Sequence, residues 1–106
     1  MTRLIQRVRG RRSPRVLAPT VTGDGHWIWR TKDQEFELEA FASLDPDIWL
    51  WRLYFWTRRT PPRRWLVERG RVAGPAEARA KAQDLLDDGV AIARIRRKHL
   101  AGLDWG

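Results

Sequence analysis

The sequence predicts one small α+β domain: an antiparallel sheet of three to four strands, one helix packed on one face of the sheet, and a basic N-terminal arm. Short aromatic or alternating stretches separated by turn residues predict the strands, and one stretch of helical periodicity follows them. The first 20 residues contain six arginines and no acidic residue. A chain of 106 residues is too short for two independent cores. We therefore assign residues 1–22 to the arm and residues 23–106 to a single domain.

The first two predicted strands are indicated by aromatic content and by alternation. Residues 26–30 (HWIWR) follow a turn at residues 22–25 and form a short aromatic strand candidate. In residues 35–40 (EFELEA), glutamates alternate with apolar side chains, which predicts a strand with one acidic, solvent-facing side and one buried side. Because Glu, Leu and Ala also favour helices, a helix over residues 34–43 is the competing interpretation.

The strongest strand signal is residues 48–56 (IWLWRLYFW), which follow a turn at residues 45–47. Apolar side chains fall on both faces of this strand, so we expect it to lie in the interior of the sheet. The connection at residues 57–64 (TRRTPPRR) holds four arginines and two prolines, and proline cannot donate to a strand ladder. It therefore predicts an exposed basic hairpin loop, with residues 65–69 (WLVER) returning as the partner strand that ends at Gly70.

A helix is predicted from Pro75 onward. Proline suits the first helical turn, and the acidic Glu77 suits the positive end of the helix dipole. A narrow apolar stripe at helical spacing is formed by Ala78, Ala82, Leu85 and Leu86. Gly89 is interpreted as the residue that ends the helix. Residues 90–97 (VAIARIRR) fit either a last strand or a second helix, and we prefer the strand because a helix has just ended.

The net charge of +8 is the strongest indication of function. Positive charge is concentrated in the N-terminal arm, in residues 57–73 and in residues 89–106, whereas residues 21–56 are net acidic. Arginine, which outnumbers lysine 18 to 3, makes bidentate contacts with phosphate and stacks on bases. We therefore expect a small nucleic-acid-binding accessory protein, with DNA preferred over RNA, of a kind encoded by phages or other mobile elements.

In this interpretation, the arginines of the arm and of the hairpin loop contact phosphates while the hairpin lies along a groove. The alternative for each cluster is that its basic side chains are solvated surface charge and bind no ligand. The candidate nucleic-acid-binding residues are Arg7, Arg9, Arg11, Arg12, Arg15, Arg58, Arg59, Arg63, Arg64, Arg69, Arg71, Arg96, Arg97 and Lys98.

The seven tryptophans are several times the usual share of this residue. We expect most of them to be core, because wide rings let a small sheet bury enough area to fold. Exposed tryptophans would instead stack on bases or anchor a protein partner. The alternative function is therefore a protein-docking module, an inhibitor, adaptor or assembly factor that uses Trp and Arg anchors. A sheet face covered by one helix would also leave apolar area for a homo-oligomer.

No feature of the sequence predicts an enzyme, a metal site or a cofactor. The chain has no cysteine, His26 and His99 are far apart, and Ser43 lacks the sequence context of a catalytic nucleophile. No glycine-rich phosphate loop occurs. We therefore expect a protein without catalytic activity and without a cofactor. Because no long apolar stretch is present, we also expect no membrane partner. A cysteine-free basic protein is expected in the cytoplasm, although the arginine-rich start would also suit a mitochondrial presequence.

Overall fold

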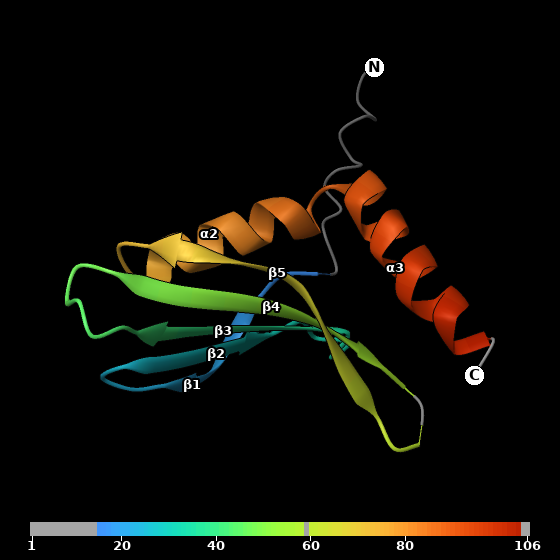
Figure 1. Ribbon diagram of the computed structural model, residues 1–106, viewed down its shortest axis with the longest axis horizontal. Coiled ribbons are helices and arrows are strands. Elements are labelled where there is room, and N and C mark those ends of the chain that lie inside the picture. The colour runs from blue at the N-terminus through green and yellow to red at the C-terminus, as the bar shows by residue number, and fades with distance from the viewer. Residues whose placement is uncertain (1–14, 59, 105–106) are drawn as a thin grey trace.

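The computed structural model describes residues 15–58 and 60–104, which form five strands followed by two helices (Figure 1). The elements are β1 (Ala18–Thr22), β2 (His26–Arg30), β3 (Phe36–Ala42), β4 (Trp49–Thr57), β5 (Arg63–Val72), α2 (Pro75–Leu86) and α3 (Gly89–Asp104). The strands pair in chain order, and each neighbouring pair is antiparallel. The α+β class with an antiparallel sheet is thus confirmed. In the described residues, the sheet has five strands, not three to four, and two helices follow it, not one.

The core lies between the sheet and α2, which crosses one face of the sheet (Figure 1). Alternate positions of β3 and β4, including Leu38 and Leu53, are fully buried on this side. They meet the small side chains of Ala78 and Ala82 on α2, together with Leu86. Small residues let a helix approach a sheet closely, so large side chains of the strands can fill the space between the layers. The predicted helix and its apolar stripe are confirmed, and β4 is confirmed as an interior strand.

Residues Gly89–Asp104 form the 16-residue helix α3, so the preference for a strand at residues 90–97 was wrong. Gly89 does not end a helix but begins one, because α2 is already capped at Asp87. The physical reason is Asp88, whose Oδ1 accepts the backbone N–H groups of Val90 at 3.0 Å and Ala91 at 3.2 Å. An aspartate in this position satisfies the first free N–H groups of a helix and starts a new one.

Residues 18–22, which the sequence placed in the arm, form the edge strand β1. The chain enters this strand through Leu17, which is 1% exposed and is held against α2. Its backbone N–H donates to Gln83 Oε1 at 3.0 Å, and its carbonyl accepts from Arg79 Nε at 3.1 Å. The anchored backbone and the buried side chain hold the following residues beside β2. The predicted arm at residues 1–14 lies outside the described residues.

The basic connection after β4 is a hairpin, as predicted, but the loop is shorter than expected. Arg63 and Arg64 belong to β5 and pair with Thr57 and Trp56 of β4. The ladder shifts by one residue at a bulge opposite Leu53 and Tyr54, and bulges increase the local twist. The distal part of the β4–β5 hairpin turns away from the rest of the sheet (Figure 1). Neither of the two helices in the described part of the chain is long and apolar enough to span a membrane.

A close contact between β4 and β5 generates a first stability prediction. The buried ring of Trp51 lies on Gly70, and a Cβ atom at position 70 would come within 2.7 Å of Trp51 Nε1. We expect Gly70→Ala to destabilise the fold by roughly 1–3 kcal/mol, because a close-packed ring must shift. Gly89→Ala is the matched control, since nothing lies within 4 Å of its Cβ position. Urea unfolding should show a loss for the first variant only, and equal midpoints would contradict the packing described.

A second prediction concerns pH. His99 of α3 lies against the rings of Phe55 and Trp65, with centroid separations of 5.9 and 5.3 Å. Burial, and secondarily the charge of Lys98, lower the pKa of His99 below its ordinary value of 6.5. As the pH falls through 6.5, His99 is protonated in the unfolded chain before it is protonated in the folded chain. The neutral, buried His99 therefore contributes fully to stability above that pH, and the contribution is lost below it.

We expect the melting temperature to fall between about pH 7.5 and 5.5, and the fall to become shallower in His99→Gln. His26→Gln is the control, because His26 lies on β2 with its side chain on the other face of the sheet, beside Glu39. The control should keep the fall. A pH dependence that disappears in the control and persists in His99→Gln would contradict the assignment.

Candidate nucleic-acid interface

The face of the sheet opposite α2 carries five of the six arginines that lie in the described strands. We call it the open face, because both helices lie on the other side and no described element covers it (Figure 1). Strand alternation and register place its side chains in rows that run across the sheet. The rows are Trp56 and Arg64; Arg30, Glu37, Tyr54 and Leu66; Ile28, Glu39, Arg52 and Arg69; and His26, Phe41, Leu50 and Arg71.

Positive charge dominates the open face. Its five arginines, from β2, β4 and β5, face two glutamates, both on β3. Arg69 and Arg71 lie two residues apart on the same side of β5, so their backbone positions are roughly 6.5–7 Å apart. The arrangement is a basic surface that spreads over three strands.

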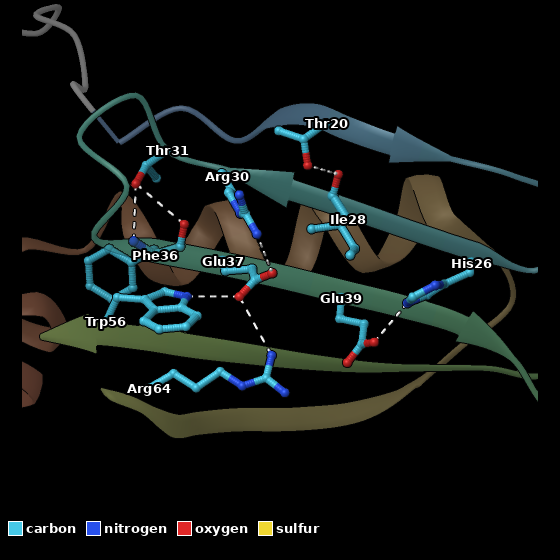
Figure 2. A network of polar contacts seen from close by, with 10 residues as sticks. All are labelled: Thr20, His26, Ile28, Arg30, Thr31, Phe36, Glu37, Glu39, Trp56 and Arg64. Carbon is cyan, nitrogen blue, oxygen red and sulfur yellow. Dashed lines mark hydrogen bonds and ion pairs between the residues drawn. The ribbon is translucent and has the colours of Figure 1, made fainter. Parts of the chain in front are cut away.

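Glu37 organises the centre of the open face (Figure 2). Its Oε1 accepts from Trp56 Nε1 at 2.8 Å and lies 3.6 Å from Arg64 Nη1, while its Oε2 accepts from Arg30 Nη2 at 3.3 Å. The residue is only 4% exposed. The prediction that residues 35–40 have a solvent-facing acidic side was therefore wrong at this position. Glu37 is covered by its own partners, which come from three other strands.

Two arginines of the open face lie on aromatic rings. The guanidinium carbon of Arg64 is 4.0 Å from the centroid of Tyr54, and that of Arg52 is 5.0 Å from the centroid of Phe41. Contacts of this kind stabilise the cation and restrict its position, and they keep it at the surface of the sheet. The result is a layer of cations over rings, which is the combination that single-stranded nucleic acids bind through phosphates and stacked bases.

A pocket of about 620 Å³ lies at one end of the open face, between the β2–β3 turn and the β4–β5 loop. We call it the turn pocket. Trp56 and Arg30 belong both to this pocket and to the open face, so the two are continuous. The lining residues are Arg30, Lys32, Asp33, Gln34, Trp56, Thr57, Arg58 and Pro62.

The structure separates the arginines that the sequence grouped together. Of the predicted residues, Arg64, Arg69 and Arg71 lie on the open face and Arg58 lines the turn pocket. Arg63 points to the other face, where its guanidinium carbon is 5.5 Å from the centroid of the Trp65 ring.

The third predicted cluster lies in the helix layer and not with the others. Arg96 of α3 forms an ion pair with Glu35, and Arg97 and Lys98 are exposed on the same helix. Arg15 lies beside α2, where its carbonyl accepts from Gln83 Nε2 at 3.0 Å. Five further candidates fall outside the described residues: Arg7, Arg9, Arg11, Arg12 and Arg59.

Sequence reasoning missed Arg30, Lys32 and Arg52, which the structure adds to the candidate interface. Each was overlooked because it lies in the net acidic segment at residues 21–56 and not in a basic block. Arg52 carried a usable signal, since a charged residue inside the otherwise apolar β4 marks the side of the strand that faces solvent. Arg30 and Lys32 become neighbours of Arg58 only through the fold.

Comparisons of the chain with models of known families, with curated proteins and with solved structures find no match.

The Glu37 network generates a third prediction. Glu37→Gln keeps an acceptor for Trp56 but removes the charge that both arginines face, so we expect a loss of roughly 1–3 kcal/mol in the free energy of unfolding. Glu39→Gln is the control on the same strand, because the carboxylate of Glu39 has one ion-pair partner among the described residues, His26 at 2.7 Å, and is more exposed. It should cost less than about 1 kcal/mol. Equal losses in the free energy of unfolding, measured with urea, would show that Glu37 contributes no more to stability than Glu39.

Proposed function

We propose that this protein is a small nucleic-acid-binding accessory protein, not an enzyme, and that it binds a strand on the open face of its sheet. The observation that carries the proposal is the set of five arginines interleaved with aromatic side chains on a face that no described element covers. Phosphate contacts supply most of the affinity of such surfaces, and rings beside them accept bases.

The open face supports a single strand more directly than a duplex. Tyr54, Phe41 and Trp56 lie among the arginines, where unpaired bases could stack after displacing a guanidinium. A duplex keeps its bases stacked inside the helix, so it would contact the arginines but its bases would not stack on the aromatic rings. The twisted β4–β5 hairpin remains the element that would enter a groove if the ligand is a duplex. We expect DNA to be the partner before RNA.

The test is a salt titration of a labelled 20-nucleotide DNA strand and of the matching duplex. Affinity should fall linearly with the logarithm of salt concentration. In the triple variant R52Q/R69Q/R71Q, three lost phosphate contacts should reduce the slope by about 2 for a single strand. Melting temperature should change little, because exposed charges contribute little to folding.

The matched control is R94Q/R97Q/K98Q, which removes three charges from the exposed side of α3, in the other layer. Both triple variants lower the net charge equally, so a general effect of charge would weaken binding equally in the two. The proposal requires the larger loss in the open-face variant. If neither DNA nor RNA binds at low salt, and a protein survives nuclease treatment in a pull-down, the function is protein docking instead.

A further inference from the structure

The turn pocket brings together three cations from two separate segments of the chain. Arg30 and Lys32 come from the end of β2 and the turn after it, and Arg58 comes from the first residue after β4. Arg58 Nη2 donates to the carbonyl of Asp33 at 2.6 Å, which fixes the guanidinium across the gap between the two segments. Arg30 is fixed by its bond to Glu37. Two of the three cations are therefore already held in place.

The turn beneath the pocket is rigidly built. Thr31 is 2% exposed, and its Oγ1 donates to Asp33 Oδ1 at 2.6 Å and accepts the backbone N–H of Phe36 at 3.1 Å (Figure 2 shows its contacts with Phe36). Asp33 Oδ1 also accepts the backbone N–H of Glu35 at 2.9 Å. Among the described lining residues Asp33 is the one acid, and it is engaged in shaping the turn. The lining keeps an excess of two positive charges, since three cations face one carboxylate.

Gln34 occupies the left-handed region of the backbone, with φ of 61°. Glycine adopts this conformation without cost, whereas a residue with a side chain is strained by roughly 1 kcal/mol or more. The strained position carries a side chain that lines the pocket, and its amide can both donate and accept hydrogen bonds. Strain of this kind gathers at ligand sites, because the side chain then contributes something that glycine cannot.

We propose that the turn pocket binds the terminal phosphate monoester of the nucleic-acid strand that lies on the open face. This inference rests on the proposed function. A terminal phosphate carries a charge of about −1.5 to −2, while each phosphate within a strand carries −1. The excess of two positive charges in the pocket therefore matches the end of a strand better than its interior.

Trp56 places the end of the strand. Its indole N–H is bonded to Glu37, which fixes the ring where the open face meets the pocket. A nucleic-acid strand that runs along β5 past Arg71, Arg69 and Arg64 reaches Trp56 next, because Arg64 pairs with Trp56 in the β4–β5 ladder. The last base then stacks against the indole, and the terminal phosphate enters the pocket among Arg30, Lys32 and Arg58.

The experiment compares three DNA strands of one sequence: with a 5′ phosphate, with a 3′ phosphate, and with hydroxyl groups at both ends. We expect one phosphorylated strand to bind roughly tenfold more tightly than the unphosphorylated strand, as charge-assisted hydrogen bonds are gained. The phosphorylated strand that binds more tightly shows which end of the DNA, 5′ or 3′, the pocket binds. Equal affinity of all three strands overturns this inference and leaves the proposed function standing, whereas absence of binding by every strand overturns both.

Variants assign the gain to the pocket. K32Q, an exposed position, and the double variant K32Q/R58Q should each reduce the ratio of affinities between phosphorylated and unphosphorylated strands. Q34G should reduce the ratio while the melting temperature stays the same or rises, because the strain at position 34 is relieved. The control R69Q/R71Q should weaken all strands and keep the ratio. A ratio that is unchanged in K32Q, K32Q/R58Q and Q34G would overturn the assignment to the pocket.

Discussion

The carboxylate of Glu37 is the point on which the open face depends, because it joins four neighbouring strands. Glu37 lies on β3, and its partners Arg30, Trp56 and Arg64 come from β2, β4 and β5. A nearly buried carboxylate must be paired with donors, since the cost of removing it from water is otherwise several kcal/mol. The requirement fixes the relative positions of two arginines and an indole that local sequence preferences alone would leave free.

This network divides the arginines of the open face into two kinds. Arg30 and Arg64 are paired with Glu37 and hold the surface in shape. Arg52, Arg69 and Arg71 are exposed, and in the proposed function they present charge to the nucleic acid. On the other side of the sheet, α2 and α3 cover the apolar side chains and leave the open face uncovered. In the proposed function, the nucleic acid would meet exposed arginines carried by a rigid sheet.

The sequence contained enough information for β4, its hairpin partner and α2, because each shows a strong local pattern. The aromatic run of β4 has no competing interpretation, and the alanine stripe of α2 has the helical spacing. The α3 helix was missed because its start depends on one side chain, Asp88, which local pattern assigned to the preceding helix. Strand β1 was missed because all five of its residues are exposed, so it shows no alternation of buried and exposed positions.

The site was less predictable than the fold. A basic loop was foreseeable from four arginines between residues 57 and 64, but the direction of each side chain was not. Arg63 and Arg64 are adjacent in sequence and point to opposite faces, since both lie in a strand. The burial of Glu37 depends on partners from three other strands, and no reading of residues 35–40 alone contains them. Charge counts therefore lead only to a proposed class of partner, and register shows which charges lie together on one face.

The central claim is that a nucleic acid lies on the open face, and the indole N–H signals of the tryptophans test it most directly. Trp56 is partly exposed on that face, and its indole N–H is bonded to Glu37, whereas Trp51 is buried beneath α2 on the other side of the sheet. An NMR titration with a short DNA strand should shift the indole signal of Trp56 progressively and leave that of Trp51 in place. Binding that leaves the Trp56 signal unmoved, or that shifts Trp65 beside α3 instead, would contradict the account.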